Sequence, residues 1–176
     1  MMQEGNHRLR AMEPSDADRL FEWENRSEEW WMGATMGPWS LAGMKTFAAA
    51  HQDIWAAGQT RLMLMHHDET VGAFDLYEVN ARNRTAGVGV VVAPEARQRG
   101  HGGVGMRLLH AYAFGHLGLK VLKAEVPSRH VASLKLFLSA GYVRCGELPK
   151  WIRKGAVREP VTLLALQGPA TENSEA

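Results

Sequence analysis

The chain has 176 residues, of which 45% are hydrophobic and 22% are charged, and its formal net charge is +1. The hydrophobic content excludes an intrinsically disordered chain, and the balanced charge excludes nucleic-acid binding through a bulk electrostatic field. A chain of this length is expected to form one domain that buries roughly two thirds of its unfolded surface.

Cys145 is the only cysteine, so an intramolecular disulfide is impossible and a cytoplasmic location is favoured. Because Cys145 lies in an expected strand, a packing role is favoured over a nucleophilic one. The N-terminal residues lack the apolar segment of a signal peptide, and no run of about 18 apolar residues could span a membrane. We therefore expect a cytoplasmic protein whose partners are neither membranes nor nucleic acids.

The first expected elements are a strand over residues 7–12 and a helix that ends near Asn25. Residues 14–18 contain proline, serine and aspartate, which are typical of a helix start. The aromatic segment 30–39 is interrupted by glycine and proline and is expected to be a loop. Ser40 can cap a helix that runs to about residue 57, which Gly58 ends.

Residues 61–67 and 71–79 alternate between apolar and polar side chains and predict a hairpin with its turn at 68–69. A polar turn at 80–84 leads into a strand over 87–92. That strand consists mostly of β-branched residues and glycine, as expected when both faces are buried. Pro94 ends it, because proline has no N–H for the ladder.

A basic, glycine-rich turn with the sequence RQRGHGG follows at residues 97–103. Its glycines allow positive φ angles and a close approach of backbone to a ligand. Apolar residues spaced by three and four positions predict that a helix opens here, so its N-terminal N–H groups face the same ligand. The pattern favours a phosphate-bearing ligand, with a purely structural turn as the alternative. The spacing matches neither a Rossmann fingerprint nor a P-loop.

The remaining expected elements are a strand over 120–126, a helix over 131–140, and strands over 142–148 and 161–166. Residues 167–176 are polar and acidic and are expected to form a disordered tail. The folded domain is therefore expected to span residues 1–166.

The Arg97-x-x-Gly100-x-Gly102 turn after a strand, followed by helix, strand, helix and Gly141-Tyr142, resembles the GNAT family of acetyl-CoA-dependent N-acetyltransferases. Residues 75–79 and 83–86 most resemble the spermidine/diamine and ribosomal-protein branches. The resemblance implies a single α+β domain with a mixed, mostly antiparallel sheet of about seven strands. Helices would flank this sheet, which would splay between its fourth and fifth strands.

The resemblance implies acetyl-CoA as cosubstrate and no metal. The turn would bind the pyrophosphate, and the pantetheine arm would bond to backbone in the splay as an added strand does. One strand amide would polarise the thioester carbonyl. The residues expected to contact the cosubstrate are Val90, Val91, Val92, Arg97, Gln98, Arg99, Gly100, His101, Gly102, Gly103, His130 and Ser133.

An acceptor ammonium has a pKa of about 10.4, so a group must accept its proton directly or through water. Glu78 is the first candidate for this base and Glu125 the second. The family often has a tyrosine acid in the last helix, but Phe137 stands at that position here. Tyr142, Ser133, His130 and water remain candidate donors to the departing thiolate, with core packing the favoured role of Tyr142. His130 replaces the family's asparagine.

Evidence in the sequence for the acceptor is thinner. Acidic and aromatic residues could line a site for a cationic amine with cation–π support, although acidic residues at helical spacing more often form a solvated face. A polyamine or diamine is the first expectation. The alternatives are a peptide N-terminus, an aminosugar or drug amine, and a catalytically weak CoA-binding regulatory module. The residues expected at the acceptor are Glu28, Glu29, Trp30, Trp31, Trp39 and Tyr77.

Two further expectations concern metals and assembly. His66 and His67 are adjacent, and neighbouring strand residues point to opposite faces, so we expect no metal site there. Dimers are frequent in the GNAT family, so a homodimer is expected, but these residues identify no contact surface.

Overall fold

The computed structural model describes residues 2–32, 37–50 and 53–169. Its centre is an eight-stranded sheet in the order β1-β2-β3-β4-β5-β6-β8-β7. All neighbouring pairs are antiparallel except β5 and β6, which are parallel. The mixed, mostly antiparallel sheet is confirmed, and the strand beyond the expected seven is the short β1. The strands are β1 Gln3–Glu4, β2 His7–Ala11, β3 Thr60–His66, β4 Glu69–Asn80, β5 Thr85–Val92, β6 Val121–Pro127, β7 Val143–Lys154 and β8 Val157–Gln167.

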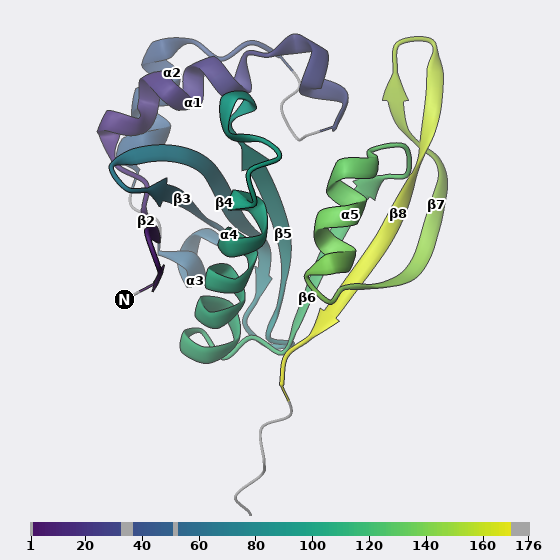
Figure 1. Ribbon diagram of the computed structural model, residues 1–176. Helices are drawn as coiled ribbons and strands as arrows, with labels where there is room; N and C mark the ends of the chain where they lie inside the picture. Colours follow the sequence, from purple (N-terminus) through teal and green to yellow (C-terminus); the bar gives the residue numbers. More distant parts are fainter. Residues whose placement is uncertain (1, 33–36, 51–52, 170–176) are drawn as a thin grey trace, which may run out of the picture.

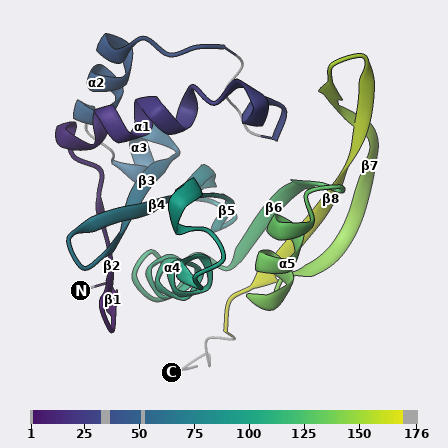
Figure 2. The same cartoon turned by 45° about the horizontal axis from the view of Figure 1, so that its top comes forward.

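Helices flank the sheet, with α1 and α2 on one side and α4 and α5 on the other (Figures 1 and 2). We call these sides the α1 face and the α4 face. Within the described residues no helix has the length and apolar character needed to cross a bilayer. The helices are α1 Ala17–Glu24, α2 Leu41–Ala49, α3 Ile54–Ala57, α4 His101–His110 and α5 Val131–Ser139, with short 3-10 turns η1 Pro14–Asp16, η2 Ser27–Met32 and η3 Pro94–Ala96 and a π-helical extension η4 Ala111–His116.

Neighbouring residues of β4 show how the two faces are separated. The Phe74 ring lies on the α4 face, directly against Gly105, where any Cβ would collide with the ring. Asp75 points to the α1 face, where its carboxylate pairs with Arg61 of β3. Arg61 also pairs with Glu24 of α1. The sheet therefore has an apolar contact with α4 and a charged network beneath α1.

The parallel pair β5–β6 opens into a splay. Only three rows are in register, Thr85↔Val121, Ala86↔Leu122 and Gly87↔Lys123. Beyond them β5 stays paired with β4 as far as Val92, while β6 stays paired with β8 as far as Pro127. The two strands diverge visibly in Figure 1. We define the splay as residues 88–92 and 124–127; it confirms the expected separation of the fourth and fifth predicted strands.

The segment after η2 differs from the sequence prediction. The single helix expected over residues 40–57 is two helices, α2 and α3, because the Asp53 carboxylate accepts the N–H groups of Trp55 and Ala56 and caps a new helix. The predicted cap at Ser40 and the stop at Gly58 are confirmed. The segment expected to be a loop over 30–39 begins within the 3-10 turn η2, and its residues 33–36 lie outside the described residues.

The C-terminal hairpin is longer than expected. Strands β7 and β8 extend to a turn at Gly155, whose φ is +61°. One register shift lies at Arg144/Gly146, and a second, between Leu148 and Ile152, spans Pro149 and lets the ladder continue past it. Gln167, the first residue of the expected tail, pairs with Val121 at the end of β8, whereas residues 170–176 lie outside the described part.

Candidate active site

The splay exposes alternate backbone groups of β5. The Ala93 N–H donates to the Val71 carbonyl at 2.9 Å, in the same register that pairs Ala73 with Val91. Because an antiparallel ladder alternates, the N–H and C=O of Val91 face β4, whereas those of Val90 and Val92 face the splay. Of the three expected valine amides, two therefore face the side where a ligand strand could add.

The glycine-rich turn at the end of β5 contains two residues in left-handed conformations, Gln98 at φ +61° and Gly100 at φ +83°. Helix α4 begins directly afterwards at His101. The N–H groups at its start have no preceding helical turn whose carbonyls could accept their hydrogen bonds. A Cβ on Gly102 would lie 3.2 Å from Leu136 of α5, so this glycine allows α4 and α5 to approach closely. The turn thus combines backbone donors, a helix dipole and little side-chain cover.

Arg97 links this turn to the α1 face. Its Nε donates to the Val92 carbonyl at 3.1 Å, and its guanidinium pairs with Glu29 of η2 at 3.0 Å. Although burial opposes it, this bond from Arg97 holds the pKa of Glu29 below its usual value. Arg97 is therefore a structural bridge across the mouth of the splay, while Gln98 and Arg99 are exposed.

The other wall of the splay begins with His130 and Ser133, both half-buried, at the start of α5. Burial, and then the positive charge of Arg97, lower the pKa of His130, so its imidazole is neutral at pH 7. The charge of Arg97 acts on His130, so the start of α5 lies near the turn at 97–103.

The two candidate bases are brought together. The Lys123 ammonium lies 2.7 Å from the Glu78 carboxylate and 2.9 Å from that of Glu125. Glu78 reaches this position from an irregular register in β4, where its φ is +48°. Tyr77 lies beside them with its ring over Gly87, and burial followed by the charge of Glu125 raises its pKa. The sequence treated Glu78 and Glu125 as alternatives, whereas the structure makes them one charge cluster.

Tyr142 is placed in the core. It is 2% exposed, its hydroxyl lies 3.3 Å from His110 Nε2, and the Phe137 ring meets it edge-on at 5.0 Å. Burial raises the pKa of Tyr142. This placement favours the packing role over the general acid that the sequence also allowed.

The expected acceptor residues each have a partner within the protein. Trp30 Nε1 donates to the Glu24 carbonyl, and Lys154 of the hairpin lies 3.9 Å above the Trp31 ring. The backbone N–H and C=O of Trp39 bond to the side-chain amide of Asn25. Glu28 forms an exposed ion pair with Arg26. The acidic and aromatic segment therefore connects α1, α2 and the β7–β8 hairpin.

Sequence reasoning missed the cations of the α1 face, Arg61 and Lys123. Arg61 carries no local signal, because its partners Glu24 and Asp75 are distant in sequence. Lys123 was detectable, since Lys123 and Glu125 are two residues apart on one strand and must share a face.

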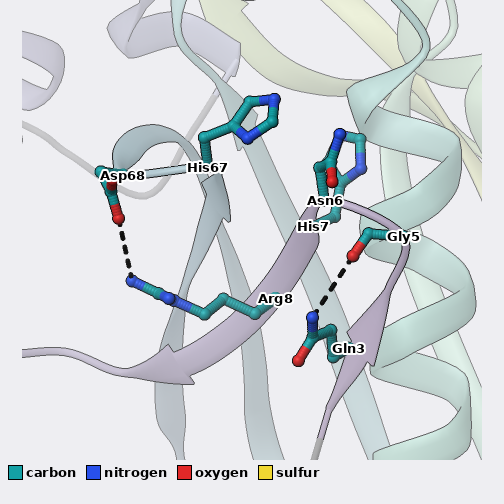
Figure 3. A pocket seen from close by; sticks show the side chains of 7 residues that line it. All are labelled: Gln3, Gly5, Asn6, His7, Arg8, His67 and Asp68. Carbon is teal, nitrogen blue, oxygen red and sulfur yellow. Dashed lines mark hydrogen bonds and ion pairs between the residues drawn. The ribbon is translucent and has the colours of Figure 1, made fainter.

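A polar pocket lies away from the splay, at the β1–β2 edge of the sheet (Figure 3). Beside it the His66 and His67 rings lie 4.5 Å apart. The expectation that they point to opposite faces is wrong, because His67 has left the strand with a φ of +53°. No three His, Cys, Asp or Glu side chains in the described ranges are grouped as a metal site. The pocket is lined by Gln3, Gly5, Asn6, His7, Arg8, His67 and Asp68.

Residues 7–143 match the family model described as an acetyltransferase (GNAT) domain. The chain therefore belongs to the GNAT family, and its class of activity is N-acetyl transfer. No curated protein sequence matches the chain.

Solved structures with the same fold include spermidine N-acetyltransferase from Vibrio cholerae in complex with CoA and spermine, with a TM-score of 0.84 and 18% identity over 94% of this chain and 97% of that one. A dodecameric structure of the Vibrio cholerae enzyme in an intermediate state matches with a TM-score of 0.79 and 19% identity, over 94% and 95% of the two chains. A probable acetyltransferase matches with a TM-score of 0.80 and 21% identity, over 95% of each chain.

Proposed function

We propose that the chain transfers the acetyl group of acetyl-CoA to a primary amine by direct attack in a ternary complex. The observation that carries the proposal is the splay, with the backbone of Val90 and Val92 along one wall and the N-terminus of α4 at its mouth. This arrangement supplies donors for a diphosphate and for an extended, amide-containing arm. Family membership supplies the reaction class.

On the donor side, the turn at 97–103 would hold the diphosphate with backbone N–H groups. The amides of Val90 and Val92 would bond to the pantetheine arm, and one would stabilise the developing oxyanion. The sulfur would leave as a thiolate, whose conjugate thiol has a pKa of about 8.5, so Phe137 at the family's tyrosine position need not stop the reaction. Positioning would therefore provide much of the catalysis.

On the acceptor side, Glu78 or Glu125 would take the proton of the incoming ammonium through water. A polyamine or diamine is the preferred class, because carboxylates gather on the α1 face and the Tyr77 ring lies near Glu78 and Glu125. The Vibrio cholerae enzyme of this fold is described with CoA and spermine. A peptide N-terminus and an aminosugar or drug amine are the alternatives.

The test is release of free thiol from acetyl-CoA by the full chain against a panel of polyamines, monoamines, aminosugars and peptides. We expect turnover with at least one amine and the highest kcat/KM for a diamine or polyamine. Bound CoA without turnover on any amine would instead identify the catalytically weak CoA-binding module, an outcome that Phe137 and His130 make worth testing.

The donor site has its own test, the affinity of CoA for Gly102→Trp. The indole would lie between the turn, Val92 and Leu136, where a Cβ is already crowded, so we expect binding to weaken at least about a hundredfold. Gly115→Trp is the matched control, because a Cβ there meets nothing within 4 Å. Equal affinity in both variants would rule out the turn as the donor site.

A second copy of this chain is the macromolecular partner that we propose. Strand β7 forms one edge of the sheet, and the hairpin exposes Val143, Trp151 and Val157. An unpaired edge with exposed apolar side chains is suited to association. Light scattering of the wild type and of Trp151→Lys would test this; a monomeric wild type would exclude it.

A further inference from the structure

Lys123 lies where the splay begins. Gly87 and Lys123 form the last paired row of β5 and β6, and Tyr77 of β4 continues this row on the other side of Gly87. Paired residues of a row project from the same face, so Tyr77 and Lys123 both lie on the α1 face. A side chain on Gly87 would collide with the Tyr77 ring. The missing side chain therefore leaves the ring room beside Lys123.

The charges at this point do not cancel. The Lys123 ammonium contacts Glu78 and Glu125 at 2.7 and 2.9 Å, so two carboxylates share one cation and one negative charge remains. The hydrogen bonds that Lys123 donates to Glu78 and Glu125 raise the pKa of Lys123, which stays protonated at pH 7. The arrangement matches what an alkylammonium ligand would require, with the cation supplied by the chain itself.

Other carboxylates on this face are held more firmly. Asp75 receives two bonds from the planar guanidinium of Arg61, which also binds Glu24, and all three side chains are at most about one fifth exposed. Lys123 is 42% exposed and holds its partners through one flexible point charge. It is therefore the cation that a ligand can displace more readily.

The distance between Lys123 and the expected reaction centre determines which nitrogen of a ligand could reach it. Val90 lies three residues beyond Gly87 on β5, which corresponds to about 10 Å of strand. This spacing suits a second ammonium on a flexible diamine whose first nitrogen attacks near the Val90 amide. The attacking nitrogen would lie too far away for direct contact, so either glutamate would take its proton only through bridging waters, as proposed above.

We propose that Lys123 determines specificity by occupying the site, between Glu78 and Glu125, that would bind the distal ammonium of a di- or polyamine. The inference rests on the proposed amine acetylation and adds the charge of the acceptor to it. With Lys123 in place the enzyme attracts a second cation through one net negative charge; without it, two carboxylates are free.

The experiment compares hexylamine with hexamethylenediamine, which have the same length and differ by one distal ammonium. In the full chain, Lys123→Met is expected to raise the ratio of kcat/KM for diamine over monoamine about fivefold, as for an exposed ion pair. Lys135→Met, which removes an exposed lysine from α5, should leave the ratio unchanged. Lys123→Arg should keep the ratio at or below that of the wild type.

Adding Glu125→Gln to Lys123→Met should return the ratio towards that of the wild type, an effect that a merely structural lysine would not produce. An unchanged ratio in Lys123→Met, with turnover retained, would overturn the inference and leave the proposed function intact. Absence of turnover on both amines and on the whole amine panel in the wild type would overturn both. Should Lys123→Met fail to fold, a diamine preference in Lys123→Arg clearly above that of the wild type would contradict the inference.

Discussion

The two sides of the splay are built on different principles. The turn at 97–103 and the start of α4 present backbone groups and glycines from one continuous segment. The α1 face presents charged side chains that four separate elements bring together, from Glu24 of α1 to Lys123 of β6. The donor side that we propose therefore depends on backbone shape, whereas the proposed acceptor side depends on the balance of charges.

The largest effect on the charged side is expected from removing the buried guanidinium of Arg61. Arg61→Met would leave Asp75 and Glu24, which are mostly buried, without the guanidinium that holds both. We expect a loss of about 3 kcal/mol in the free energy of unfolding, because uncompensated buried charges are costly. Urea denaturation measures it, with Arg8→Met as control, since the Arg8–Asp68 pair is exposed and loose at 3.9 Å. Equal losses of unfolding free energy in the two variants would show that the network beneath α1 stabilises the fold no more than an exposed ion pair does.

On the side built from backbone groups, the contact between α4 and the sheet is the most sensitive to substitution. Gly105→Ala would place a methyl group into the Phe74 ring, so we expect a loss of about 2 kcal/mol despite the better helix propensity of alanine. Gly115→Ala has open space and should gain about 0.5 kcal/mol. Thermal or chemical unfolding of this pair checks the sign of each change. Stabilisation by Gly105→Ala would mean that close packing is not needed there.

Acid should weaken the α4 side through His110. Burial lowers the pKa of His110 to about 4, whereas the unfolded value is about 6.5. The unfolded chain then binds more protons, so this stabilisation is present above pH 6.5 and is lost as the pH falls towards 4, by about 3 kcal/mol. The free energy of unfolding as a function of pH should be flatter in His110→Gln than in the wild type. His116→Gln, at an exposed position, should retain the wild-type slope.

Arg97 joins the two sides, and its replacement is expected to have a smaller effect on both. Arg97→Lys retains the charge but loses the planar fork that binds Val92 and Glu29 together. We expect about fivefold weaker CoA binding and a similar rise in the KM of the amine, because both sides lose their common strut. Calorimetry and steady-state kinetics measure these effects. A change in CoA affinity alone would show that the two sides are independent.

The order of the elements around the glycine turn, and the turn itself, could be predicted from the sequence. The strand, the Pro94 stop, the glycine turn and the following helix are local and contiguous, so periodicity and backbone preferences suffice to predict them. The divergence of β5 and β6 was predicted from the family resemblance, and the register of the two strands confirms it.

The charged side depends on contacts between residues that are distant along the chain. Whether Glu78 and Glu125 are alternatives or partners depends on a register shift in β4, and the neutralisation of Asp75 depends on a strand pairing fourteen residues away in sequence. The same holds for Arg97, whose guanidinium turns to Glu29 rather than remaining free. Ion pairs join side chains that are close in space and distant along the chain, so local sequence preference does not specify them.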